Sequence, residues 1–176
     1  MTALLLAAGL HLDAPIVLTA QSPASSQETS LVPWCGVRAG YVFADADADH
    51  NGDVVGLFSA IEAALLFGLD AQGTNEVAVT RLPILVEARG VYGNRWGAGL
   101  VSLAGYGFVG GGVGGGPAYF QAFDDSRLRA FGLWVVRGGG GVELAFLRAF
   151  TRVEVGVGVR DLRPELSGSL AVGGRF

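Results

Sequence analysis

The sequence predicts an all-β fold, a closed antiparallel up-and-down transmembrane barrel of about eight strands. Three observations support this prediction. Hydrophobic residues make up 51% of the chain and charged residues only 16%, which is well below the usual quarter. The apolar residues alternate with polar ones instead of forming a block long enough for a membrane helix. In addition, 29 of the 176 residues are glycine, which disfavours helices.

The N-terminal segment is interpreted as a leader and a linker. Residues 4–10 form a short apolar run, small residues follow, and a plausible cleavage site comes after Ala20. This layout predicts a secretory signal peptide over residues 1–20, followed by a polar linker over residues 21–33. A further strand or a plug segment stays open as the alternative, because the polar residues that begin at His11 interrupt the apolar run.

The barrel itself is predicted over residues 34–176, where strand-like segments alternate with turn-forming ones. In each strand-like segment apolar residues recur at every second position, which is the period of a strand. The expected strands are residues 35–43, 57–69, 76–92, 96–108, 117–123, 128–146, 152–161 and 166–176. The expected connections are the acidic loop 45–53, the turns at 70–75, 92–95, 124–127 and 161–164, the glycine run 110–116 and the short segment 147–151.

Three of these elements need a separate argument. Residues 57–69 are rich in helix-forming Ala, Leu and Glu, but we assign a strand because the neighbouring segments alternate. Pro83 cannot donate a ladder hydrogen bond, so we expect a bulge or a local break there. Residues 128–146 are treated as one bent strand in spite of their glycines, which brings the total to about eight, an even number as in single-chain barrels of this kind.

Charged residues of the expected strands lie on the face opposite the apolar one. We predict that they form a charge network in the lumen, where an unpaired charge is strongly destabilising and each carboxylate therefore pairs with an arginine. The residues of this network are Arg38, Glu62, Arg81, Glu87, Arg89, Arg129, Arg137, Glu143, Arg152, Glu154 and Arg160, with Arg175 in the last strand. An arginine facing the middle of the bilayer would cost about 2–4 kcal/mol, which explains why these residues keep one phase.

Aromatic residues near the strand ends predict a girdle at the membrane interface. They are Tyr41, Phe43, Tyr92, Trp96, Phe146 and Phe176. A soluble lipocalin-like barrel that binds an apolar ligand alternates in the same way, but with the apolar face inside. This soluble barrel stays open as an alternative.

The chain ends in SGSLAVGGRF and keeps its alternation to the last residue, with Leu170, Val172 and Phe176 on one side. From about residue 34 to residue 176 the chain resembles the small bacterial outer-membrane β-barrel proteins of the OmpA/OmpX type. In that family the final strand ends in Phe after alternating apolar residues, although an aromatic residue usually stands at the position of Gly174. The resemblance implies that the barrel-insertion machinery reads these three residues, and that outer-membrane lipid surrounds a lumen filled by side chains.

Composition excludes several functions. All 12 basic residues are arginine, so there is no lysine for a phosphate-binding loop or a Schiff base. The net charge of -4 gives no basic footprint for nucleic acid. The single cysteine, Cys35, cannot form an internal disulfide. No cofactor is expected, and the protein is expected to be a monomer.

The acidic loop holds the most specific motif of the sequence. Asp47, Asp49, Asn51 and Asp53 alternate, with Gly52 between the last two, as in the first half of a calcium-binding loop. These oxygen ligands form a candidate calcium site on the exterior side of the cell, although the glutamate that closes such a loop is missing. A solvated acidic turn is the alternative.

Candidates for catalysis are few. His11 is expected to leave with the signal peptide, and His50 stands in the acidic loop with no serine close to it and no G-x-S-x-G motif in the chain. We therefore expect a non-enzymatic outer-membrane barrel with a structural, surface-interaction or minor transport role. The alternatives are the soluble ligand-binding barrel and a barrel enzyme that acts on envelope lipids.

Overall fold

The computed structural model describes residues 9–21, 30–44, 53–73, 77–98, 100–122 and 125–176. The strands in this part of the chain are β1 (Gly9–Gln21), β2 (Ser30–Ala44), β3 (Asp53–Gly68), β4 (Asp70–Gly73), β5 (Val77–Arg81), β6 (Ile84–Ala98), β7 (Val101–Ala122), β8 (Asp125–Phe146), β9 (Ala149–Arg160) and β10 (Arg163–Arg175). These residues contain no helix that is long and apolar enough to cross a membrane.

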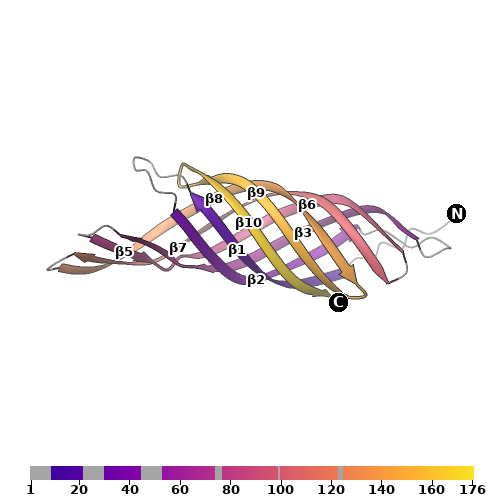
Figure 1. Ribbon diagram of the computed structural model, residues 1–176, viewed down its shortest axis with the longest axis horizontal. Coiled ribbons are helices and arrows are strands. Elements are labelled where there is room, and N and C mark those ends of the chain that lie inside the picture. Colours follow the sequence, from indigo (N-terminus) through magenta and orange to yellow (C-terminus); the bar gives the residue numbers. More distant parts are fainter. Residues whose placement is uncertain (1–8, 22–29, 45–52, 74–76, 99, 123–124) are drawn as a thin grey trace.

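Eight of the strands form a closed ring in the order β1, β2, β3, β6, β7, β8, β9, β10, with β10 paired back to β1. Neighbours in the ring are antiparallel and successive in the chain, apart from the short hairpin of β4 and β5, which adds to β7 outside the ring. Figure 1 shows the ring strands slanting steeply across the barrel. The predicted fold class, an up-and-down antiparallel barrel, is confirmed, and the pairing of β10 with β1 closes the ring.

The first strand of the ring lies where the sequence analysis places a signal peptide. β1 pairs with β10 on one side and with β2 on the other. Its polar residues, which begin at His11, form the buried face, and the apolar residues between them are exposed. The described strands therefore include residues 9–21 and 30–33, which the sequence analysis assigns to the leader and the linker. β1 matches the alternative of a further strand, and the removal of a leader stays a prediction.

Two connections expected from glycine and turn residues are strand interior instead. Residues 92–95 lie within β6, and the glycine run 110–116 lies within β7. Glycine is required at Gly114 because a Cβ there would collide with the carbonyl oxygen of Ile84 on β6. The run therefore marks close packing between strands and not a break. The break predicted at Pro83 is confirmed, since β5 ends before it and β6 begins after it.

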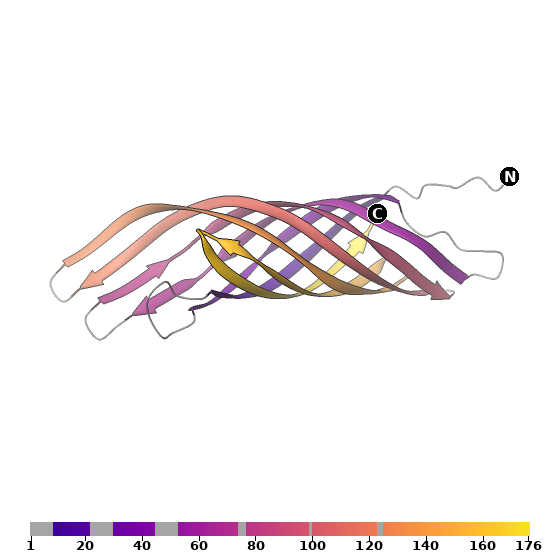
Figure 2. The ribbon, with the colours of Figure 1, turned by 90° about the horizontal axis from the view of Figure 1, so that it is seen from above.

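The strands project further at one end of the barrel than at the other. The start of β1, the end of β10 and the junctions of β6 with β7 and of β8 with β9 lie at one end, which we name the terminal end (Figure 2). At the opposite end, named the extended end, β4, β5 and the tips of β7 and β8 project past the rest of the ring. Residues 125–134 of β8 pair only with β7, because β9 joins β8 from Val135 onward. We name β4, β5, residues 116–122 of β7 and residues 125–134 of β8 the extended sheet.

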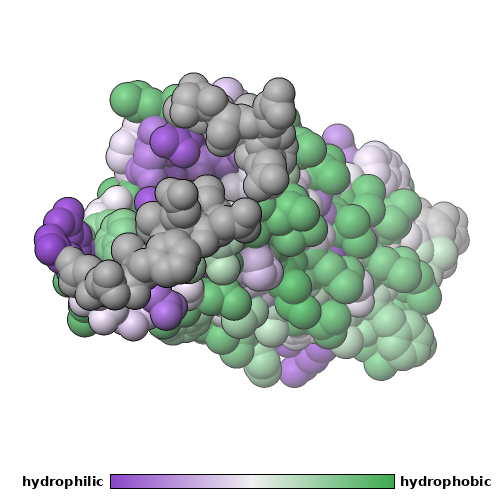
Figure 3. Space-filling model, turned by 60° about the vertical axis from the view of Figure 1, so that its left-hand side comes forward, coloured by the Kyte–Doolittle hydropathy of each residue, from purple (hydrophilic) through white to green (hydrophobic). Residues whose placement is uncertain are grey.

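The outer wall of the ring is apolar, as Figure 3 shows for one side. Val155 is 65% exposed, whereas the adjacent Glu154 is 5% exposed. This phase contradicts the soluble lipocalin-like alternative, which needs valine inside and the charged residues outside. The aromatic residues predicted as a girdle are all exposed, and the strand segments that carry them run towards the terminal end: Tyr41, Phe43, Tyr92, Trp96, Phe146 and Phe176.

Candidate functional site

Side chains fill the lumen in layers. The layer near the extended end is an apolar cluster of Val17, Val32, Trp34, Leu66, Leu85, Leu133 and Val135. The layer towards the terminal end contains Val42, Phe58, Ala60, Val91, Ala104, Tyr106 and Phe108. Between and beside these clusters, six arginines and six carboxylates are buried: Arg38, Arg89, Arg95, Arg137, Arg152, Arg160, Asp13, Glu62, Glu87, Glu143, Glu154 and Glu165.

The larger group of charges, which we name the central network, joins four carboxylates to five arginines and a histidine. Its members are Asp13, Glu62, Glu143, Glu154, Arg38, Arg89, Arg95, Arg152, Arg175 and His11. Seven ring strands supply these residues, and the eighth, β7, contributes the hydroxyl group of Tyr106, which donates to Glu154. The central network thus ties every strand of the ring to the others.

Glu62 on β3 lies at the middle of this network. One oxygen, Oε2, lies 2.6 Å from Nε of Arg89 on β6. The other, Oε1, lies 2.5 Å from Nη1 of Arg152 on β9 and 3.0 Å from Nε2 of His11 on β1. The side chains of Glu62, His11 and Arg152 are fully buried, so the charge of the carboxylate is balanced by protein groups alone.

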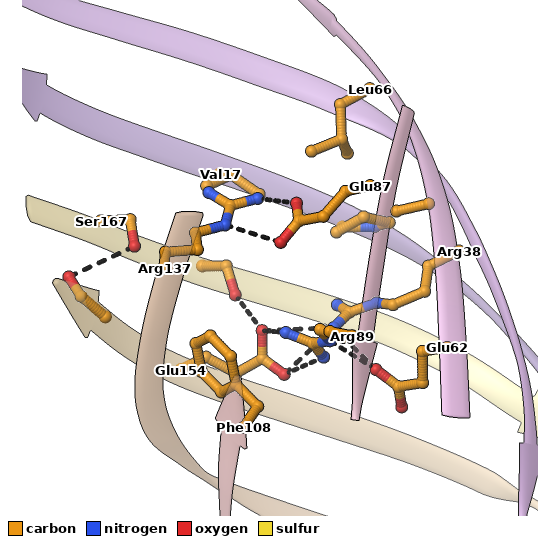
Figure 4. A pocket seen from close by; sticks show the side chains of 14 residues that line it. Val17, Arg38, Glu62, Leu66, Glu87, Arg89, Phe108, Arg137, Glu154 and Ser167 are labelled. Carbon is orange, nitrogen blue, oxygen red and sulfur yellow. Dashed lines mark hydrogen bonds and ion pairs between the residues drawn. The ribbon is translucent and has the colours of Figure 1, made fainter. Parts of the chain in front are cut away.

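Glu154 on β9 is the second centre, and Figure 4 shows its carboxylate beside the guanidinium of Arg89. Arg89 donates through Nη1 at 2.9 Å, and Arg38 donates through Nη1 at 3.1 Å. The hydroxyl groups of Tyr106 and Ser169 complete the set at 2.7 and 2.8 Å. Four donors from β6, β2, β7 and β10 therefore converge on one carboxylate, which satisfies the hydrogen-bonding demand of a buried charge.

Glu143 on β8 gathers the arginines nearest the terminal end. It accepts from Nε of Arg152 at 2.7 Å and from Nη2 of Arg95 at 2.9 Å, and it also pairs with Arg175. The guanidinium of Arg152 lies 4.7 Å from the ring centre of Phe150. Stacking of this kind favours a desolvated guanidinium, which suits an arginine that is fully buried.

A smaller group, which we name the outer network, lies closer to the extended end. Arg137 donates through Nε to Glu87 at 2.8 Å. Arg160 lies 3.0 Å from Glu165 through Nε and donates to the side-chain oxygen of Gln21 at 3.0 Å. Arg137 and Glu165 lie 3.9 Å apart, which joins the two halves of the outer network.

Little free space remains inside the ring. A cavity of about 30 Å³ lies between the two networks, bordered by charged residues of both and by Val17 and Phe108 (Figure 4). One water molecule needs roughly 10–15 Å³ on this measure, so the cavity has room for about one or two. Side chains therefore close the lumen, as an eight-stranded barrel permits.

Beyond the apolar layer the lumen opens at the extended end into a hollow of about 400 Å³. Its wall includes Asp70 on β4 and Arg81 on β5, whose charged groups lie 3.6 Å apart. The Arg81 guanidinium also lies 5.7 Å from the ring centre of Phe131.

The structure brings ten of the twelve predicted network residues together in the two networks, all except Arg81 and Arg129. Arg81 borders the hollow, and Arg129 is exposed on the extended sheet, 5.9 Å from the ring centre of Phe120. Both have the lumen-facing phase. However, β5 and the tip of β8 extend past the ring, where the same phase meets solvent.

Four charged or titratable members of the networks were missed by the sequence analysis, each for its own reason. His11 and Asp13 were assigned to the signal peptide, and Arg95 to a turn within residues 92–95. Glu165 has the same phase as Ser167, so the alternation of the last strand, extended two residues back, would have found it.

The residues of the predicted calcium site, His50 and the predicted insertion signal do not belong to the two networks. Asp47, Asp49, Asn51 and His50 lie outside the described residues, and Asp53 is the first residue of β3. β2 ends and β3 begins at the terminal end, so the segment between them connects strands at the end that also holds the chain terminus. The residues of the predicted insertion signal, Leu170, Val172 and Phe176, are exposed on the outer face.

Comparison with known proteins supports this architecture. No protein-family model matches the sequence, and no curated protein has a significantly similar sequence. Among solved structures, the chain is similar to the N-terminal β-barrel domain of OprF from Pseudomonas aeruginosa, with a TM-score of 0.55, 15% identity, and coverage of 94% of this chain and 97% of that one. It is also similar to Neisserial surface protein A (NspA), with a TM-score of 0.53, 11% identity, and coverage of 95% and 97%.

Two features together define the class of protein. The ring has the fold of the small bacterial outer-membrane β-barrels, and its wall has apolar residues outside and paired charges inside. The chain therefore has the fold of the small bacterial outer-membrane β-barrels.

Proposed function

We propose that this protein is a sealed, non-enzymatic barrel that anchors the extended sheet at the bacterial surface for interaction with other molecules. The observation that carries this proposal is the contrast between a free space of about 30 Å³ among the charges of the lumen and two ring strands that are about twice as long as a membrane crossing needs. A transmembrane β-strand needs about 9–11 residues, whereas β7 and β8 have 22 each.

The orientation follows from the two ends. Outer-membrane barrels have short turns on the periplasmic side and longer elements outside. β8 and β9 meet in a tight turn at the terminal end, where β10 also ends, and the hairpin of β4 and β5 and the projecting parts of β7 and β8 lie at the extended end. The extended end therefore faces the exterior, and the hollow of about 400 Å³ opens outward.

An enzymatic role has little support from the described residues. A catalytic group must reach a substrate, but the carboxylates of the two networks are buried and engaged by arginines. A transport role for the lumen would require both networks to come apart. Surface interaction needs no such change, because the extended sheet is already exposed.

Two measurements test the proposal. First, purified protein in planar lipid bilayers should give no steady ionic current, and a stable open channel would contradict the sealed lumen. Second, a membrane-impermeant maleimide applied to intact cells should label Leu128→Cys on the extended sheet and not Leu100→Cys at the terminal end, both in a Cys35→Ser background. The reverse pattern of labelling would contradict the orientation.

A further inference from the structure

The hollow of about 400 Å³ at the extended end has opposite charges on separate parts of its wall. Arg81 on β5 borders it on one side, and Asp161, in the turn that follows β9, borders it on another. Around the wall, β5 pairs with β7, β7 with β8 and β8 with β9. Two strands therefore lie between the guanidinium of Arg81 and the carboxylate of Asp161.

The guanidinium of Arg81 has hydrogen-bonding capacity to spare. Its Nη1 lies 3.6 Å from Oδ2 of Asp70, which is longer than a hydrogen bond, and the side chain is 40% exposed. A guanidinium presents five N–H donors in a rigid planar fork that matches the two oxygens of a carboxylate. Arg81 can therefore bind a carboxylate that enters the hollow.

The carboxylate of Asp161 has an oxygen to spare. Oδ1 accepts a hydrogen bond from the N–H of Trp134 at 3.0 Å, and the N–H of Asp161 donates to the carbonyl of Trp134 at 3.2 Å. These two bonds fix the position of the residue on the wall. The other oxygen has no hydrogen bond within the described part of the chain, and the residue is exposed. Asp161 can therefore accept a hydrogen bond from a cationic donor.

The other two charges that border the hollow are engaged more fully. Arg160 lies 3.0 Å from Glu165 through Nε and donates to a glutamine side chain through Nη2 at 3.0 Å. Oδ1 of Asp70 accepts from a serine hydroxyl at 3.3 Å and from a glutamine amide at 3.2 Å. Among the described residues that border the hollow, Arg81 and Asp161 are thus the charges best placed to meet a ligand.

Apolar side chains lie between the two charges. Phe131 and Leu133 on β8 border the hollow together with Pro83. Leu133 belongs to the apolar cluster beneath the hollow, and Phe131 packs against that cluster. Ligand pockets commonly have volumes of about 300–1,000 Å³ and combine apolar walls with a few polar groups that fix orientation. The hollow has the size and the wall for a small organic molecule with an apolar middle.

We propose that the hollow binds a small zwitterion whose carboxylate pairs with Arg81, whose ammonium group pairs with Asp161, and whose apolar body rests on Phe131 and Leu133. The ligand class is therefore an amino acid in which an apolar spacer separates the two charged groups. A ligand with only one charge leaves one of the two protein charges without a partner. This proposal names a ligand class for the surface role proposed above and rests on the outward orientation of the extended end.

The test uses the folded protein in a nonionic detergent and three probes that share one aromatic ring. They are 4-(aminomethyl)benzoate, which carries both charges, and 4-methylbenzoate and 4-methylbenzylamine, which carry one each. Amide chemical shifts of the isotope-labelled protein measure the dissociation constants and should move at Gly132 and Leu133. An exposed ion pair contributes up to about fivefold in affinity, so the zwitterion should bind about fivefold more tightly than either single-charge probe.

Two substitutions should separate the two charges. Arg81→Gln should weaken binding of the zwitterion about fivefold and leave 4-methylbenzylamine unchanged or bound more tightly. Asp161→Asn keeps an oxygen for the N–H of Trp134 and should weaken the zwitterion to the same extent, without weakening 4-methylbenzoate. Arg148→Gln, at an exposed residue of the terminal end, is the matched control and should change none of the three affinities.

Three results would overturn the proposal. The first is equal affinity for the zwitterion and for a single-charge probe. The second is wild-type affinity for the zwitterion in both Arg81→Gln and Asp161→Asn. The third is no binding of the zwitterion, or shifts confined to residues away from the hollow. Each of these results leaves the sealed barrel and its orientation intact, because the bilayer and labelling measurements do not depend on a ligand.

Discussion

The carboxylate of Glu62 and the guanidinium of Arg152 lie 2.5 Å apart across the barrel. Their strands, β3 and β9, are four places apart in the ring in both directions, so the pair spans the lumen from one wall to the opposite one. Pairing between adjacent strands therefore does not bring the two residues together. The pair therefore acts as a cross-brace inside the cylinder and is the natural first target for a test.

Glu62→Ala should be strongly destabilising. It leaves Arg152, Arg89 and His11 without their shared carboxylate, and the removal of one partner from a buried ion pair costs about 3–5 kcal/mol. The free energy of unfolding, measured by urea titration in lipid vesicles, should fall by that amount. Thr151→Ala, on the exposed face of β9, serves as the control and should change stability by no more than about 0.5 kcal/mol. Equal effects of both substitutions would contradict the brace.

The Glu87–Arg137 pair should behave differently when both partners are replaced. Glu87→Ala alone leaves a buried guanidinium with only the distant Glu165 at 3.9 Å, and should cost about 3–5 kcal/mol. Replacing the pair with Leu and Met of similar volume should be neutral or stabilising, because the desolvation cost of both charges disappears. A double replacement that is as damaging as the single one would show that this pair contributes net stability of its own.

Packing in the lumen can be tested at Gly40, which is buried, with Gly90 on the exposed face of β6 as a control. A Cβ at Gly40 would collide with the ring of His11 and lie 2.8 Å from Cγ of Glu62. Gly40→Ala should therefore destabilise the barrel by about 1–3 kcal/mol, as overpacking does. A Cβ at Gly90 meets nothing within 4 Å, so Gly90→Ala should be neutral or slightly stabilising. Thermal unfolding of the two variants in detergent measures the difference, and a loss at Gly90 equal to that at Gly40 would count against the described lumen.

Removal of β1 should abolish the barrel. A chain that starts at Gln21, where the sequence analysis expects the mature protein to begin, lacks the strand that joins β2 to β10. The two exposed edges would then face hydrocarbon with unsatisfied backbone groups, which lipid does not tolerate. We expect the truncated chain to lose heat-modifiable migration in gel electrophoresis, whereas the chain from Gly9 keeps it. If the truncated chain kept heat-modifiable migration, the result would support a mature protein that begins at Gln21.

The phase of the strands could be predicted from the sequence because alternation is a local property. Val155 and Glu154 are successive residues of one strand, so their side chains point to opposite faces, and the apolar one faces lipid. The same rule assigned the lumen face to Arg38 and Arg152 without any knowledge of their partners. Fold class and the identity of most network residues follow from that rule alone.

Partners and boundaries could not be predicted in the same way. The depth at which Glu62 meets Arg152 depends on the stagger of the strands around the ring, which closure sets and no single segment encodes. β1 was missed because a short barrel strand and a signal peptide share apolar and small residues. Arg95 was missed because its glycine and asparagine neighbours are typical of a turn, although in β6 Gly93 leaves room for the backbone and side chain of Tyr106.

The seam between β1 and β10 joins the earliest described strand to the last one, with His11 opposite Arg175. The ring therefore cannot close until β10 has been made, and its closing ladder joins two strands that are far apart in the sequence. Because the two strand ends meet at the same rim, a circular permutant that links them by a short tether and opens the chain at the β9–β10 turn would keep every ladder of the ring.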